Sequence, residues 1–134
     1  MRIRPIAAVA LLCAASEVLM ARQAPVSPVF TAQQAAAGRS AYATSCASCH
    51  MPDLSGSNDT PPLAGPVFMS TWRARTTKDL FEYLSASMPR GGASLSTETY
   101  ESITAYILEA NGASAGETSF RATTAVAIRD LIGR

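Results

Sequence analysis

The clearest hydrophobic pattern of the chain lies in the segment that ends at Asn111-Gly112. Apolar residues recur there with the spacing of one helical face, at Tyr100, Ile103, Tyr106, Ile107 and Ala110. Ser96 or Thr97 can cap the start of this segment, and Asn111-Gly112 is typical of a helix end. The pattern predicts an amphipathic helix that buries one face.

Two other helices are predicted earlier in the chain. One covers about 32–45, with Thr31 as its N-cap. The other covers about 78–87, where Thr77 can act as the cap and Pro89 stops the helix. Both are predicted to pack through one apolar face.

The remaining segments carry weaker signals. A short helical turn is predicted over 66–72 and a last short helix over 123–132. The proline-containing segments at 23–30 and 51–66 are predicted to be a linker and a loop. Because no alternating strand pattern occurs, the fold class is predicted to be all-α.

The N-terminus differs in composition from the rest of the chain. Arg2 and Arg4 form a basic start, an apolar run covers residues 6–15, and small residues follow. This run is about half as long as a stable membrane-spanning helix. Residues 1–21 are therefore predicted to be a cleaved signal peptide, which places the protein in the periplasm or otherwise outside the cell, with no stable membrane span afterwards.

Length and charge narrow the classes of partner. The 134 residues suit one compact domain, and the 48% hydrophobic content depends more on alanine than on bulky side chains. Removal of residues 1–21 takes Arg2, Arg4 and Glu17, which leaves as many basic as acidic side chains. Since no basic run or basic helix face occurs, nucleic acid is not expected as a partner.

The strongest chemical signal is the sequence Cys46-x-x-Cys49-His50. This spacing is that of c-type haem attachment, in which two thiols form thioethers and the adjacent imidazole reaches the iron. His50 is the only histidine of the chain, which supports its role as the proximal ligand. The motif predicts one covalently attached haem c.

A Cys-x-x-Cys pair can also be part of a zinc site, a thioredoxin-like redox couple or a disulfide. A structural zinc ion needs four ligands, but the only further cysteine or histidine is Cys13, which falls in the predicted signal peptide. A redox couple is typical of a strand-to-helix junction, whereas the residues before Cys46 have a helical pattern. Haem attachment is therefore the favoured interpretation.

The second axial ligand is expected to be a methionine. Two of the five methionines fall in the predicted signal peptide, and Met51 is too close to the proximal histidine to reach the opposite face of the ring. Met69 lies in an apolar cluster typical of core packing. Met88 directly precedes Pro89 and a glycine-containing loop, where the backbone can direct the thioether, so Met88 is the predicted ligand.

Over residues 31–112 the chain resembles a monohaem class I cytochrome c of bacterial type. The matching segments are Gly38-x-x-x-Tyr42, Cys46-x-x-Cys49-His50, Pro61-Pro62-Leu63-Ala64-Gly65, Trp72, Met88-Pro89, and Tyr100 through Tyr106-Ile107-Leu108 to Asn111-Gly112. The resemblance implies a small all-α fold of about three to five helices wrapped around a covalently attached haem. Residues 22–30 would then be a linker and residues 113–134 a C-terminal extension.

The resemblance also implies roles for three residues of the haem pocket. The carbonyl of Pro61 would accept a hydrogen bond from the second imidazole nitrogen of His50. Leu63 would press against the haem ring, and Trp72 would donate a hydrogen bond to a propionate.

Ligation by both His50 and Met88 would leave no iron position open to substrate. The expected function is therefore transfer of single electrons between a redox protein donor and acceptor, and no catalysis is expected. The alternative is a dedicated haem c subunit of a periplasmic dehydrogenase or oxidase complex, for which residues 126–132 could supply a permanent apolar patch. A third, less favoured function is ligand binding or sensing at a haem that opens on the Met88 side.

Overall fold

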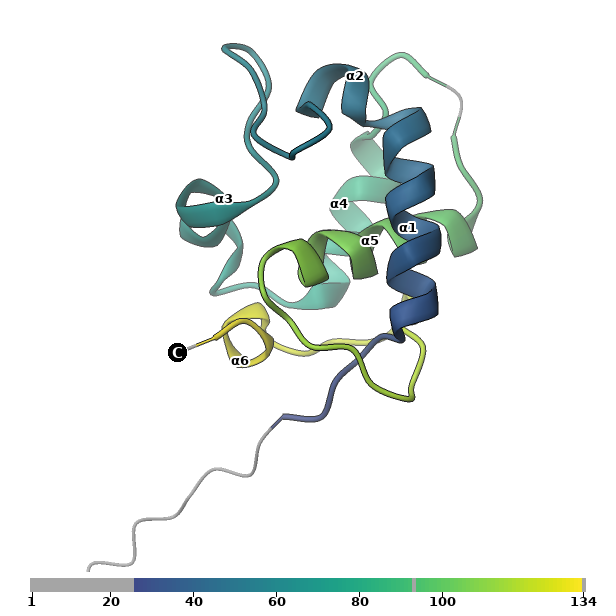
Figure 1. The fold of residues 1–134 in the computed structure, drawn as a ribbon, viewed down its shortest axis with the longest axis vertical. Helices are drawn as coiled ribbons and strands as arrows, with labels where there is room; N and C mark the ends of the chain where they lie inside the picture. Colours follow the sequence, from purple (N-terminus) through teal and green to yellow (C-terminus); the bar gives the residue numbers. More distant parts are fainter. Residues whose placement is uncertain (1–25, 93, 134) are drawn as a thin grey trace, which may run out of the picture.

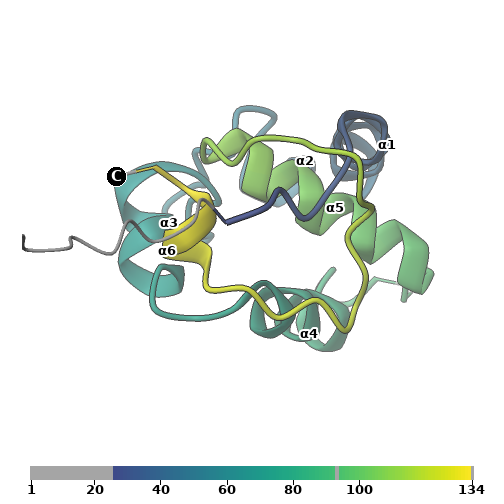
Figure 2. The same cartoon turned by 90° about the horizontal axis from the view of Figure 1, so that it is seen from below.

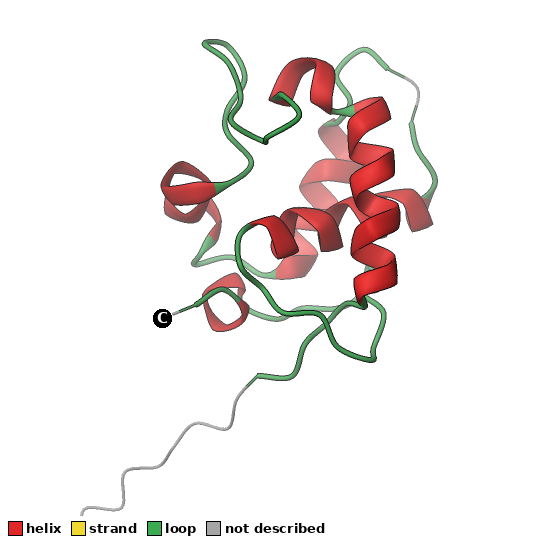
Figure 3. Cartoon of the chain, in the orientation of Figure 1, coloured by secondary structure: helices red, strands yellow, loops and turns green. Residues whose placement is uncertain are grey.

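The computed structural model describes residues 26–92 and 94–133, and this part of the chain contains six helices and no strand (Figures 1 and 3). The helices are α1 (Ala32–Ser45), α2 (Ala47–His50), α3 (Gly65–Trp72), α4 (Thr77–Ser87), α5 (Thr97–Ala110) and α6 (Ile128–Leu131). The predicted all-α class is confirmed. The predicted signal peptide, residues 1–21, lies outside the described residues.

Helices α1 and α5 form the most extensive helix-to-helix contact, seen in Figure 1 where the upright α1 crosses α5. Gly38 allows this close approach, because a Cβ atom there would overlap the backbone carbonyl of Ser102. Beside this crossing, the rings of Tyr42 and Tyr106 pack with their centroids 5.3 Å apart. The crossing fixes the direction in which α1 delivers the segment that follows it.

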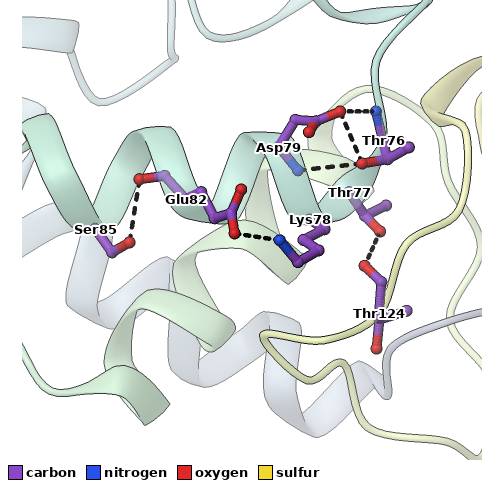
Figure 4. A network of polar contacts seen from close by, with 7 residues as sticks. All are labelled: Thr76, Thr77, Lys78, Asp79, Glu82, Ser85 and Thr124. Carbon is purple, nitrogen blue, oxygen red and sulfur yellow. Dashed lines mark hydrogen bonds and ion pairs between the residues drawn. The ribbon is translucent and has the colours of Figure 1, made fainter.

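Helix α4 begins one residue earlier than the sequence pattern predicts, and its cap is Thr76 rather than Thr77 (Figure 4). Thr76 Oγ1 accepts a hydrogen bond from the backbone N–H of Asp79, and the Asp79 carboxylate accepts one from the Thr76 N–H in return. Thr77 is buried, and its hydroxyl donates instead to the carbonyl of Thr124, 2.6 Å away. A tertiary contact therefore decides which threonine caps the helix.

Helix α4 has a polar face and a buried apolar face. Lys78 and Glu82 form an ion pair one helical turn apart, and the Ser85 hydroxyl donates to the Glu82 carbonyl (Figure 4). The opposite side of the helix is buried, through Leu80, Phe81 and Leu84. Helix α4 is thus amphipathic, as its sequence predicts.

The C-terminal segment returns along α4 and ends beside α3, as Figure 2 shows from below. Phe120 is fully buried, and its backbone exchanges two hydrogen bonds with the side chain of Gln34, of 2.7 and 3.0 Å. Ile128 is also fully buried, and its N–H donates to the carbonyl of Arg75 at 2.9 Å. The extension therefore belongs to the same hydrophobic core as the rest of the domain.

The helix predicted over 123–132 is shorter in the structure, because α6 covers only Ile128–Leu131. The preceding residues use their backbone groups against α4 instead: the carbonyl of Val126 accepts from the N–H of Thr77 at 2.9 Å. Backbone groups committed to another segment cannot form helical hydrogen bonds.

No helix within residues 26–92 and 94–133 is long and apolar enough to cross a membrane.

Replacement of Gly38 by alanine is expected to lower the free energy of unfolding by at least about 2 kcal/mol, because α1 and α5 must separate to admit the methyl group. Chemical denaturation of the purified protein measures this effect. Ser40→Ala, at an exposed position of the same helix, is the control and should change stability by less than about 0.5 kcal/mol. Equal denaturation midpoints for Gly38→Ala and the unchanged protein would contradict the close crossing.

Loss of the α4 cap in Thr76→Ala is expected to cost about 1 kcal/mol at neutral pH, while Thr76→Ser should retain most of the stability. Hydrogen bonds from the Thr76 N–H and then its hydroxyl lower the pKa of Asp79. The stabilisation that this carboxylate contributes is therefore present above about pH 4 and lost as the pH falls through the lowered pKa. The deficit of Thr76→Ala should shrink in acid, and a constant deficit from pH 7 to pH 2 would argue against this coupling.

Candidate haem site

The Cys-x-x-Cys-His motif occupies the junction of α1 and α2. The N–H of Cys46 donates to the carbonyl of Tyr42 at the end of α1, and the Cys46 carbonyl accepts from the N–H groups of Cys49 and His50. This single turn gathers the three side chains at one end of α1. Cys46 is half-buried, Cys49 is exposed, and His50 retains only 7% of its accessible surface.

The imidazole of His50 is oriented by Pro61, as the resemblance implies. Nδ1 of His50 lies 2.9 Å from the carbonyl oxygen of Pro61. A carbonyl can only accept a hydrogen bond, so Nδ1 carries the proton and Nε2 retains a lone pair. The ring is thus held in the tautomer that can bind a metal through Nε2.

The segment that carries Pro61 and Leu63 is held in turn by Asn111, at the end of α5. The side-chain amide of Asn111 donates to the carbonyl of Leu63 at 2.9 Å and accepts from the N–H of Gly65 at 2.9 Å. The N–H of Leu63 also donates to the carbonyl of Leu54. These contacts connect the irregular segment before α3 to the helical core.

Two cavities, of about 230 and about 200 Å³, lie beside His50. Both are lined by His50, Pro61, Leu63, Tyr83, Leu84 and Met88. The first also contacts Cys46, Cys49, Ile103 and Ile107, and the second contacts Trp72 and Arg75. All seven residues predicted for the site, from four separate segments of the chain, therefore line one hollow region of the molecule.

The donor set and the walls of this region fit a covalently attached haem. Two thiols lie on one edge of the first cavity, an imidazole with a free Nε2 and a thioether line both cavities, and the aliphatic side chains of Leu84, Ile103 and Ile107 surround them. Cysteine thiols, histidine and methionine are the groups that hold haem c in electron carriers. The chemistry of the predicted residues is thus compatible with this cofactor, and all of them line the two cavities.

Aromatic side chains form the wall of the second cavity. Trp72 is buried and stacks on Phe68 with ring centroids 6.3 Å apart, while Tyr83 meets it edge-on at 5.5 Å. The guanidinium of Arg75 lies 5.1 Å from the centre of the Trp72 ring. This wall of the second cavity carries an indole and a cation, and each of these groups can bind a carboxylate.

The environment of the cysteines differs from that of a thioredoxin-like couple. Burial, followed by the charge of the neighbouring Cys49, raises the pKa of the Cys46 thiol. Redox couples of the Cys-x-x-Cys type depend on a thiol whose pKa is lowered. Cys46 and Cys49 are not joined by a disulfide, and a helix, not a strand, leads into the motif.

The family assignment agrees with this site. The family model described as "Cytochrome C oxidase, cbb3-type, subunit III" matches residues 33–107. The chain belongs to this family of c-type cytochromes. Membership confirms the resemblance to class I cytochrome c, haem c as the cofactor and electron transfer as the general function.

A solved structure is also similar to this cytochrome. It is the crystal structure of the sulfane dehydrogenase SoxCD from Paracoccus pantotrophus, with 30% sequence identity and a TM-score of 0.53. The similarity covers 72% of this chain and 50% of the SoxCD chain, so the cytochrome spans half of that chain's length. No curated protein matches this cytochrome significantly.

The residues of the site that were not predicted from the sequence include Tyr83, Arg75 and Asn111. Tyr83 lines both cavities although 42% of its surface is exposed, and its position on α4 gives no hydrophobic signal. Arg75 is an exposed cation between two helices, without a motif of its own. Asn111 was predicted only as a helix end, and nothing local indicates that its amide reaches Leu63.

Proposed function

We propose that this cytochrome carries single electrons through one haem c attached at Cys46 and Cys49, with His50 and Met88 as axial ligands. The observation that carries the proposal is that His50 and Met88 line the same two cavities, while Pro61 occupies Nδ1 of the imidazole. When bound, the haem supplies one-electron chemistry by alternation between its ferric and ferrous states.

Each residue of the site has a defined task in this function. His50 offers Nε2 as a donor, and the Pro61 carbonyl raises the basicity of the ring by accepting from Nδ1. Met88 offers a soft thioether, which favours ferrous iron and raises the reduction potential. Leu63 supplies an apolar wall, and the indole of Trp72 would donate a hydrogen bond to a propionate of the bound haem.

Two axial protein ligands would leave no iron position for a substrate. Electrons would then pass without bond formation between iron and substrate, as expected of a carrier and not of a catalyst. Cys49 is exposed, so the attachment edge lies near the surface where a redox partner can approach. Contacts of this kind are small and transient.

A second candidate is a dedicated electron-transfer subunit of an exported dehydrogenase complex. The similarity to the sulfane dehydrogenase SoxCD, at 30% identity, favours this candidate. The apolar patch expected at 126–132 does not support it, because Ile128 is fully buried and Ile132 is 7% exposed within the same chain. Co-purification with a large subunit from the native source would favour this candidate, whereas a monomeric protein would favour a mobile carrier.

Export to the periplasm is part of the proposal. It rests on the N-terminal pattern of basic residues followed by an apolar run, and on the site at which haem c is attached in bacteria.

The third candidate, a sensing haem, requires an open iron position. Rapid binding of carbon monoxide to the reduced protein at neutral pH would support sensing and count against the carrier.

The mature protein is expected to have the mass of the polypeptide plus one haem, even after extraction with acidified organic solvent, because the thioether bonds are covalent. The double variant Cys46→Ala/Cys49→Ala should lose this added mass. Ser48→Ala, at the exposed position between the two thiols, is the control and should keep it. Mass spectrometry decides the question, and a mass equal to the polypeptide alone would overturn the attachment.

Met88→Ala is expected to abolish the weak long-wavelength absorption band of methionine-ligated ferric haem. It should also lower the midpoint potential by on the order of 100 mV, because the thioether no longer stabilises ferrous iron. Met69→Ala removes the same side chain from a half-buried position in α3 and should retain both properties. Redox titration followed by absorption measures both properties. If the band survived in Met88→Ala and vanished in Met69→Ala, the ligand would be Met69.

A further inference from the structure

The hydroxyl of Tyr100 joins two points of the chain on either side of the loop that follows Met88. It donates to the carbonyl of Met88 at 2.6 Å and accepts from the N–H of Leu95 at 3.3 Å. Tyr100 lies in the first turn of the long helix α5 and is only 4% exposed. A buried hydroxyl with both a donor and an acceptor partner is fully used, so its position is strongly determined.

The backbone at Met88 has little other support on its C-terminal side. Met88 is the C-cap of α4, where the chain becomes extended, and only its N–H continues the helical pattern by donating to Leu84. Arg90 and Gly91 are exposed, and a side chain at Gly91 would meet nothing within 4 Å. The Met88 carbonyl is thus attached to the core through Tyr100.

A second tyrosine makes the equivalent contact on the proximal side. The hydroxyl of Tyr42, in α1, donates to the carbonyl of Met51 at 2.7 Å, directly after His50. Burial raises the pKa of Tyr42 above its usual range. Two long helices therefore each direct a tyrosine hydroxyl at the backbone next to one proposed axial ligand.

We infer that Tyr100 is a positioning residue for Met88: its hydroxyl closes the base of the loop and holds the thioether in place for the iron. The inference rests on the proposed ligation by Met88. Loss of the hydroxyl leaves the Met88 carbonyl and the Leu95 N–H without their partner, and the loop can then move away from the cavity. A ligand that competes with the thioether for the iron then binds more tightly.

Tyr100→Phe tests the inference, because it removes one oxygen atom and keeps the buried ring. The ferric holoprotein is titrated with imidazole, which must displace the thioether to bind. The dissociation constant for imidazole should fall by roughly three- to tenfold, the effect of one lost hydrogen bond. The matched control is Tyr106→Phe, the same change on the same helix at the contact with α1, which should leave the dissociation constant unchanged.

Stability alone does not test the inference, since either change at a buried tyrosine can lower it. The comparison of imidazole affinities does, because Tyr100 bonds the backbone of Met88 whereas Tyr106 lines neither cavity. An unchanged dissociation constant in Tyr100→Phe, or an equal shift in both variants, would overturn the inference. Were Met88→Ala to keep the long-wavelength band, the proposed ligation itself would fail, which is a distinguishable result.

A measurement on the unchanged holoprotein complements the variants. If Tyr100 closes the loop, the amide of Leu95 should be protected from hydrogen exchange, because its N–H donates to the buried hydroxyl. The exposed Gly91 amide serves as the comparison and should exchange fast. Fast exchange at Leu95 would also overturn the inference, even if Tyr100→Phe failed to accumulate.

Discussion

The close crossing of α1 and α5 is the constraint on which the rest of the molecule depends. Gly38 lets α1 approach α5 so closely that a Cβ atom at position 38 would overlap the backbone carbonyl of Ser102. The contact fixes the direction of α1, and α1 delivers the motif that ends at His50. It also sets Ile103 and Ile107 of α5 along the cavity that this motif faces. Helix packing far from any iron chemistry therefore determines where that chemistry can occur.

Part of the site, including Pro61, Leu63 and Met88, is built from irregular backbone, which needs partners from elsewhere. Strands and helices satisfy their own backbone groups, but loop carbonyls rely on side chains or water. Here the helices supply those side chains: Tyr42 and Tyr100 each hold a carbonyl beside a proposed ligand, and Asn111 holds that of Leu63. The Pro61 carbonyl in turn orients His50. Side chains of the helices thus also position site residues that lie in the irregular segments.

The C-terminal extension contributes buried side chains to the core and hydrogen bonds to other segments. The sequence pattern leaves this role open. Phe120 packs on Phe81 with ring centroids 6.3 Å apart, and Ile128 bonds through its backbone to Arg75. The extension thereby braces the segment that carries Trp72 and Arg75, one wall of the hollow region. Its apolar residues are used within the chain, so a stable partner would need another surface. Val67 and Tyr83 are exposed large apolar side chains that line the second cavity.

The sequence by itself determined what depends on near neighbours along the chain. Capping by Thr31 and Ser96, the helical period of α5 and the haem attachment motif all act within a few residues. Only the tertiary structure decided contacts between distant segments: Thr77 loses the capping role because its hydroxyl meets Thr124, 47 residues away. The reach of Tyr100 to Met88 is of the same kind, since it depends on how α5 is turned against α4. Local geometry follows from the covalent chain, whereas the orientation of one helix against another follows from the packing of the whole core.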